Sequence, residues 1–369
     1  MSIASASESL PRSVQHVLIV GAGLAGACAA LALSRSHAVT VLEADRPASG
    51  ASGAAAGLAN PFMARKANPA WRYNDALDAL HGMLNEAGAN GLFRDQGVLR
   101  PAGSSKQAGF FMETASAFPY DAQWWSAESV RERIPVIVAP DGALWLPKGG
   151  SVELPAMIEA LLTAARARGA VLRTGVRVAA WEEHDNKATV TTSSSEQIEA
   201  DLVMLCLGGG FLGHPSLDAL GLHRVKGQTV RVRRPTALDA ERLAELPALS
   251  SGGYIVPAPD SDELILGSSF EHEFEDLQPS PEVTAHIIAN AARTLPMLTD
   301  AAVTHEVAGV RVTRHRARKP LLGPLPAFRR VWTFTALGAK GLLTAPLLAQ
   351  GLPGYLQNPS GIPEEVQTP

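Results

Sequence analysis

The stretch from His16 to Glu43, HVLIVGAGLAGACAALALSRSHAVTVLE, decides the fold. Residues 16–20 are apolar and predict a buried strand, and the glycines after them predict a tight turn. The small residues from Leu24 onward predict a closely packed helix, and 38–43 alternate like a second strand. This order of strand, turn, helix and strand predicts a βαβ unit at the start of a parallel sheet.

The three glycines of GAGLAG give this unit a chemical meaning. Gly21 allows the tight turn, Gly23 lets backbone N–H groups approach a pyrophosphate, and Gly26 lets the helix pack against the strand. The anion would lie at the helix N-terminus, where free N–H groups and the helix dipole favour it. Glu43 ends the second strand, at the place where a carboxylate accepts hydrogen bonds from a ribose. These residues predict a dinucleotide site.

The next segment separates the two dinucleotide cofactors, NAD and FAD. Residues 49–57, SGASGAAAG, carry almost no side-chain bulk and no charge, so their backbone can lie against a flat, extended cofactor. This favours FAD, and a flexible linker is the alternative that composition alone leaves open. A later apolar strand ends in Gly208, Gly209 and Gly210 and is expected to return to the pyrophosphate side of the same sheet.

The rest of the chain predicts an α/β protein with a second, sheet-based domain inserted into the first. Residues 225–270 alternate as antiparallel strands and 281–295 predict a helix, whereas 331–352 predict a strand, a glycine turn and a last helix. We expect a discontinuous, Rossmann-like FAD-binding domain with an α+β substrate domain built on an antiparallel sheet. The predicted parts are 14–90, 150–222 and 305–355 for the FAD-binding domain, 91–149 and 223–304 for the substrate domain, and 1–13 and 358–369 for flexible tails.

Composition restricts the classes of function. The chain has 369 residues, 46% of them hydrophobic, and a formal net charge of −4, which argues against a general nucleic-acid coat. No stretch is long and apolar enough for a membrane span, and the first residues lack a signal peptide, so a cytoplasmic protein is expected. Cys28 and Cys206 are the only cysteines, so a cysteine-ligated metal site is not expected, and no HxxxH pattern occurs.

Several motifs together resemble the D-amino acid oxidase/glycine oxidase family of flavoproteins. GAGLAG with Glu43, SGASGAAAG, VKGQ at 225–228, GGYIVP at 252–257, GVR at 309–311 and ALGAKGLLTAP at 336–346 occur in the order seen in that family, from about residue 14 to 352. Within it, the chain is most similar to the FAD-dependent half of the bacterial bifunctional enzyme that makes 5-methylaminomethyl-2-thiouridine at the tRNA wobble position.

The resemblance implies roles for individual residues. Arg311 would hold the substrate carboxylate in a bidentate grip, and Tyr254 would face the substrate over the flavin. The start of the last helix would point at the pyrimidine edge of the flavin. The expected FAD contacts are Gly21, Ala22, Gly23, Leu24, Ala25, Gly26, Glu43, Ala44, Ser52, Ala56, Gly57, Val178, Gly208, Gly209, Gly338, Lys340, Gly341 and Leu342.

The reaction that the resemblance implies is oxidation of a C–N bond in a glycine-like amine with a free carboxylate. Arg311 anchors the carboxylate, the α C–H gives a hydride to flavin N5, and the imine hydrolyses to an oxo acid and a shortened amine. Dioxygen is the expected electron acceptor. With tRNA carrying a carboxymethylaminomethyl uridine as substrate, the oxo acid is glyoxylate. No metal and no membrane partner are expected.

A basic segment bears on the substrate. Between Val307 and Lys340 there is no acidic residue, and Arg314 to Lys319 stand where the relatives carry an aspartate before a proline. Such a face could steer a phosphate backbone, or it could be a solvated loop. Three hypotheses stay open: a tRNA-wobble oxidoreductase, an oxidase or dehydrogenase of free glycine, sarcosine or a D-amino acid, and a flavoprotein that binds a carboxylate without turnover. The sequence leaves the oligomeric state undetermined.

Overall fold

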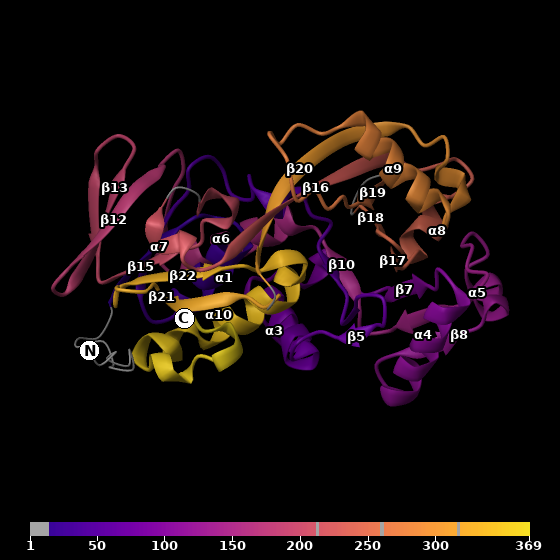
Figure 1. The fold of residues 1–369 in the computed structure, drawn as a ribbon, viewed down its shortest axis with the longest axis horizontal. Coiled ribbons are helices and arrows are strands. Elements are labelled where there is room, and N and C mark those ends of the chain that lie inside the picture. The colour runs from indigo at the N-terminus through magenta and orange to yellow at the C-terminus, as the bar shows by residue number, and fades with distance from the viewer. Residues whose placement is uncertain (1–14, 212–213, 259–261, 316–317) are drawn as a thin grey trace.

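The computed structural model describes residues 15–211, 214–258, 262–315 and 318–369. Two large sheets dominate it, and Figure 1 shows them on opposite sides of the molecule, with β16 and β20 as the long strands of the second sheet. The strand β16 spans Leu222–Arg233 and β20 spans Val303–Arg314. These two strands lie at one edge of the second sheet and line the site described below.

The first sheet is the one that the βαβ unit predicts. It has six strands in the order β11-β2-β1-β15-β22-β21, all parallel except for β21 at one edge. The strands are β1 (His16–Val20), β2 (Ala38–Leu42), β11 (Val171–Arg173), β15 (Leu202–Leu205), β21 (Leu321–Pro324) and β22 (Val331–Thr335). The strand β15, which precedes Gly208 to Gly210, pairs with β1 and therefore brings those glycines beside GAGLAG.

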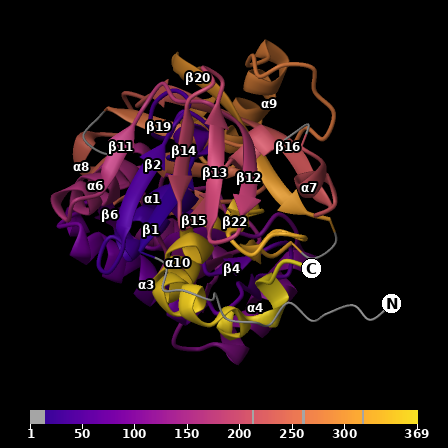
Figure 2. The ribbon, with the colours of Figure 1, turned by 90° about the vertical axis from the view of Figure 1, so that its left-hand side faces the viewer.

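Both faces of this sheet are covered, as a parallel sheet requires. In β1, Val17 and Ile19 pack into the helical side, whereas Leu18 and Val20 pack against a small antiparallel sheet. The helices are α1 (Leu24–Leu33), α3 (Tyr73–Glu86), α6 (Leu154–Ala167) and α10 (Gly341–Gln357). The small sheet consists of β12 (Val178–His184), β13 (Lys187–Thr192) and β14 (Gln197–Ala200), and Figure 2 looks onto it.

The second large sheet has eight strands in the order β20-β16-β19-β18-β17-β7-β9-β8. It is antiparallel except where β17 pairs with β7. Besides β16 and β20, its strands are β7 (Val98–Pro101), β8 (Gln123–Trp125), β9 (Ala143–Leu146), β17 (Ala248–Ser250), β18 (Tyr254–Pro257) and β19 (Glu263–Gly267). Helix α9 (Pro281–Ala292) packs on β16 and β19 through Ile287 and Ala291.

Short elements connect these layers. The helices are α2 (Ala51–Ala54), α4 (Ser105–Ala117), α5 (Ala127–Arg133), α7 (Pro215–Asp218) and α8 (Ala240–Glu245). The strands are β3 (Leu58–Ala59), β4 (Phe62–Met63), β5 (Asn68–Pro69), β6 (Phe93–Arg94) and β10 (Gly150–Val152). Among the described residues, no helix is long and apolar enough to cross a membrane.

The C-terminal end of the chain has more structure than the sequence predicts. Residues 358–369 are expected to be a flexible tail, but they form two short 3-10 turns against the body of the protein. The reason is two apolar side chains in that polar stretch, Ile362 and Val366, which are buried in the same core as α1 and α10. The other expected tail, 1–13, lies outside the described residues. The predicted domain boundaries stay a prediction, and β16 and β20 cross them.

Candidate active site

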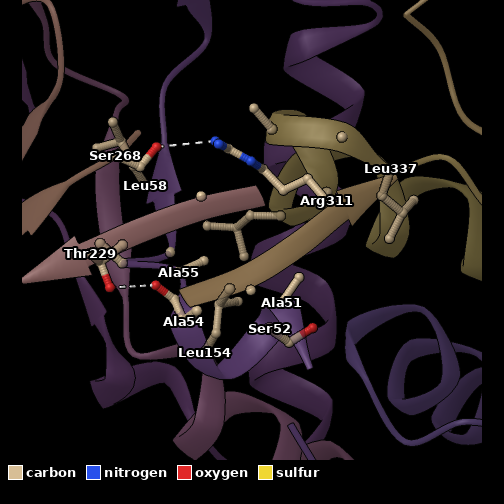
Figure 3. A pocket seen from close by; sticks show the side chains of 18 of the residues that line it. Ala51, Ser52, Ala54, Ala55, Leu58, Leu154, Thr229, Ser268, Arg311 and Leu337 are labelled. Atoms are coloured by element: carbon tan, nitrogen blue, oxygen red, sulfur yellow. Dashed lines mark hydrogen bonds between the residues drawn. The ribbon is translucent and has the colours of Figure 1, made fainter. Parts of the chain in front are cut away.

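A cleft of about 1320 Å³ runs between the two large sheets. One end is formed by the carboxyl ends of β1 and β15 and by the loop that contains α2, and the other by β18, the turn after β19 and the end of α9. Such a crevice at the carboxyl ends of parallel strands is where α/β sheets bind ligands. Figure 3 shows Arg311 and side chains of α2 among the residues that line the cleft, beside the paired strands β16 and β20.

The glycine turn forms a cradle that only glycines allow. A β carbon on Gly21 would lie 2.4 Å from the carbonyl oxygen of Cys206, and one on Gly26 would lie 1.9 Å from the carbonyl oxygen of Gly21. Gly21 also has a φ of +108°, a conformation that favours glycine. The turn therefore keeps the N-terminus of α1 close to the end of β15, open to an anionic ligand. These contacts fit a dinucleotide pyrophosphate.

Glu43 lies in the cleft wall and is tied to the glycine turn. Its carboxylate accepts hydrogen bonds from the N–H of Ala22 at 2.7 Å and from the N–H of Asp45 at 3.0 Å. An ionised carboxylate offers about four acceptor positions. Glu43 is therefore held in place by two backbone donors and keeps acceptor capacity for ribose hydroxyls.

The structure gathers most of the expected FAD contacts along this one cleft. Those that line it are Gly21, Gly23, Leu24, Ala25, Glu43, Ala44, Ser52, Ala56, Gly57, Val178, Gly208, Gly209, Gly338, Gly341 and Leu342. Ala22, Gly26 and Lys340 do not. Ala22 is fully buried and Gly26 is packed against Gly21, so both shape the turn from behind. Burial, with the charges of Arg318 and Lys319, lowers the pKa of Lys340.

Arg311 projects from β20 into the cleft. Its Nη1 donates to Ser268 Oγ at 3.1 Å and its Nη2 donates to the carbonyl of Ser269 at 2.5 Å, and its guanidinium lies 4.2 Å from the centre of the Phe270 ring. Burial lowers its pKa, but an arginine stays charged at neutral pH. Among the described residues, no carboxylate lies within ion-pair distance of it. The site therefore holds a positive charge that no acidic side chain of the described residues neutralises.

Tyr254 lies at the start of β18 and lines the same cleft. Burial raises the pKa of its phenol, while the nearby charge of Arg311 acts in the opposite direction. The phenol therefore stays protonated at neutral pH and can donate a hydrogen bond. Gly267 on the paired strand leaves room for it, because a β carbon there would lie 2.5 Å from the phenol oxygen.

Sequence reasoning missed the residues that support Arg311. Ser268 and Ser269 follow β19, and Phe270 lines the cleft beside them. Thr229 on β16 donates to the carbonyl of Ala54 at 2.8 Å and so fixes α2 against the strands, as Figure 3 shows. The VKGQ motif pointed to this region but not to its function, because the contacts join segments more than forty residues apart.

The basic segment is less uniform than its sequence. Arg330 is only 2% exposed and donates to the carbonyl of Asp201, so it is part of the core. Lys319 makes an ion pair with Glu365 at 3.6 Å. Arg316 lies outside the described residues. Fewer cations of this segment are therefore available to bind a polyanion than its sequence suggests. Elsewhere, the described ranges hold no group of three or more His, Cys, Asp or Glu side chains suited to a metal ion.

Comparisons with known proteins agree with this geometry. The chain is 26% identical over 344 residues to the tRNA 5-methylaminomethyl-2-thiouridine biosynthesis bifunctional protein MnmC of Idiomarina loihiensis, which covers 91% of this chain and 54% of that protein. It is 30% identical over 334 residues to the MnmC of Burkholderia lata, covering 86% and 50%. The chain thus spans about half the length of these curated relatives.

Solved structures share the fold. The crystal structure of glycine oxidase from Geobacillus kaustophilus matches with a TM-score of 0.80 and 23% identity, over 93% of this chain and 94% of that one. The predicted fold class is therefore confirmed. A family model described as FAD dependent oxidoreductase, DAO, matches residues 16–352, so the predicted cofactor, FAD, is confirmed as well. On this match, which covers nearly the whole chain, the protein belongs to the DAO family of FAD dependent oxidoreductases.

Proposed function

We propose that this protein oxidises the C–N bond of a glycine-like amine that carries a free carboxylate. The observation that carries the proposal is Arg311, a largely buried cation without an acidic partner among the described residues, in the same cleft as the dinucleotide cradle. A guanidinium fork matches a carboxylate in charge and shape. A substrate anion would supply the missing negative charge.

Each residue of the site has a task in this reaction. Bound FAD supplies the acceptor, at N5, for the hydride that leaves the carbon next to the amine nitrogen. Arg311 holds the carboxylate, so that the neutral amine and its α C–H take a fixed direction. Tyr254, with its protonated phenol, borders the same space and limits how the substrate can lie. Orientation is the main contribution of the protein, and no side chain has to act as a strong base.

As substrate we propose the carboxymethylaminomethyl group of wobble uridine in tRNA, with release of glyoxylate. The MnmC names of the relatives support this choice. The wall of the cleft also carries Arg65, Arg224 and Arg293, and none of the three forms an ion pair with another described residue. Cations of this kind attract a phosphate backbone.

A free amino acid such as glycine, sarcosine or a D-amino acid is the second candidate. One feature favours it: the segment after Phe270 carries Glu271, Glu273, Glu275 and Asp276, and it connects two residues that line the cleft, Phe270 and Leu277. Negative charge at this position opposes the approach of a nucleic acid. Dioxygen is the proposed electron acceptor in either case.

The two candidates are separated by anaerobic reduction of the FAD-loaded protein. We expect loss of the flavin absorbance with tRNA that carries carboxymethylaminomethyluridine, glyoxylate as a product, and peroxide once air is admitted. Binding of that tRNA should weaken steeply as salt is raised. Reduction by glycine, sarcosine or D-amino acids at ordinary rates, with no response to the tRNA, would refute the tRNA substrate and support the second candidate. An Arg311→Lys variant, which keeps the charge and loses the fork, should be impaired with every carboxylate substrate.

A further inference from the structure

Phe270 is an exposed aromatic side chain that lines the cleft directly beside Arg311, the proposed carboxylate-binding residue. It is 62% exposed, although its neighbour Arg311 is largely buried. Exposed phenylalanines on loose loops are common, so the state of the surrounding backbone decides whether this exposure has a meaning.

The backbone around Phe270 is fixed on both sides. The N–H of Ser269 donates to the carbonyl of Gln228 at 3.2 Å, and the carbonyl of Ser269 accepts from Arg311. On the other side, Glu271 and Lys226 exchange two backbone hydrogen bonds of 2.9 Å each. The exposure of the ring is therefore a property of a well-anchored position and not of a loose loop.

The ring has one covered face and one free face. The guanidinium of Arg311 lies 4.2 Å from the ring centre and covers the first. Since the side chain is still 62% exposed and lines the cleft, its opposite face and its edge border the space into which a substrate enters. A cation over one face of an aromatic ring keeps the ring in place and leaves the other face open for stacking.

We propose that the free face of Phe270 is a stacking platform for a planar pyrimidine base joined to the amine of the substrate. The proposal rests on the proposed function, because it assumes a carboxylate on Arg311. In a carboxymethylaminomethyl uracil, two methylenes and one nitrogen separate the carboxylate carbon from the ring. A short, flexible link of this kind lets the carboxylate reach the guanidinium while the base reaches the neighbouring ring. Free glycine or sarcosine would make no use of Phe270.

The test compares binding of two inert ligands to the FAD-loaded protein, followed through the change in flavin absorbance. The ligands are 5-(carboxymethylthiomethyl)uracil, in which sulfur replaces the amine nitrogen of the link, and its 5,6-dihydro derivative; both have the same carboxylate and link but differ in the planarity of the ring. Replacing an aromatic side chain that stacks on a base by alanine weakens binding roughly 5- to 150-fold. We therefore expect the planar ligand to bind roughly tenfold more tightly than the dihydro ligand. Phe270→Ala should abolish this preference, and Phe270→Trp should keep it.

Controls separate stacking from loss of apolar surface or of folding. Leu277→Ala removes another exposed apolar side chain from the same cleft wall and should keep the preference. Acetate binding should be nearly equal in wild type and Phe270→Ala, which shows that Arg311 is still in place. Equal affinity of the wild type for the planar and dihydro ligands overturns the proposal. So does a loss of acetate affinity in Phe270→Ala that is as large as the loss of affinity for the planar ligand in the same variant. Neither ligand is oxidised, so the binding preference can be measured independently of turnover. A failed turnover assay with tRNA would therefore refute the proposed substrate and leave the measured binding preference unchanged.

Discussion

Gly227 on β16 lies diagonally opposite Arg311 on the paired strand β20, and a β carbon on Gly227 would lie 2.4 Å from Nη2 of Arg311. That distance is far below any contact between non-bonded atoms, and the guanidinium cannot move freely because Ser268 and Ser269 hold its far side. The glycine of VKGQ therefore makes space for the guanidinium.

Gly227→Ala is expected to displace this guanidinium without disturbing the cofactor site. Losing one or two charge-assisted hydrogen bonds to a carboxylate costs about 1.5–3 kcal/mol each, so KM for carboxylate amines should rise by at least about tenfold. Steady-state kinetics and the flavin spectrum measure the two effects. Gly109→Ala in α4 is the matched control, because a β carbon there meets no atom within 4 Å. An unchanged KM in Gly227→Ala would show that the guanidinium does not bind the substrate.

Glu43→Ala is expected to weaken FAD binding. The substitution removes the proposed ribose acceptor and leaves the N–H of Ala22, at the glycine turn, without its partner. A hydrogen bond to a charged group contributes about 1.5–3 kcal/mol, so loss of the ribose contacts should raise the Kd for FAD by roughly tenfold or more. Titration of the apoprotein with FAD, followed by fluorescence, gives this Kd.

Two further variants make the Glu43 measurement specific. Glu43→Gln keeps one acceptor oxygen and should fall between wild type and Glu43→Ala. Asp45→Ala removes an exposed carboxylate two residues away and leaves the Asp45 N–H in place, so it should bind FAD like the wild type. If Glu43→Ala bound FAD as tightly as Asp45→Ala, the assignment of Glu43 to the ribose would be wrong.

The part of the site that the sequence predicts is the part built from neighbouring residues. The turn at Gly21 to Gly26 and the carboxylate of Glu43 belong to one βαβ unit, so their spacing along the chain fixes their positions in space. The contact between Gly227 and Arg311 depends instead on the register of two strands more than eighty residues apart. No local pattern contains that register, so VKGQ and GVR could be recognised as motifs but not as two sides of one contact.

The same reason explains other features that the sequence did not reveal. Arg330 belongs to a run of cations in the sequence, but the carbonyl of Asp201 and the side chain of Asn186, both more than a hundred residues away, receive its hydrogen bonds. Residues 358–369 have the prolines and polar residues of a frayed end, and only the tertiary structure provides the apolar surface that Ile362 and Val366 bury. Phe270 was missed because one aromatic residue in an acidic segment has no pattern of its own.

The two cysteines are expected to differ in their response to removal of FAD. Burial raises the pKa of both thiols, so neither should react with a thiol reagent at pH 8 in the FAD-loaded protein. Cys206 borders the cleft beside Gly21, whereas Cys28 is fully buried in α1. Removing FAD should therefore expose Cys206 to labelling and leave Cys28 protected, as counted by mass spectrometry of the labelled peptides. Both should react in guanidinium chloride, and rapid labelling of Cys28 in the folded protein would contradict its position.

Asp201 is expected to make folding depend on pH in the acid range. Its burial disfavours the charge, but hydrogen bonds from Lys187 and from the N–H groups of His16 and Gln15 outweigh this and hold its pKa at about 2 instead of 3.8. Because the pKa is lower in the folded protein, Asp201 stabilises folding above about pH 4, and this contribution is lost as the pH falls towards 2. Allowing for partial exposure, Asp201→Asn should lower the free energy of unfolding at pH 7 by about 1–2 kcal/mol. Urea unfolding at several pH values should show the difference between wild type and variant shrinking towards pH 2.

Glu199→Gln, at an exposed position on β14, is the control and should show no such dependence. A loss of stability in Asp201→Asn that does not depend on pH would mean that packing and not charge holds the start of β1.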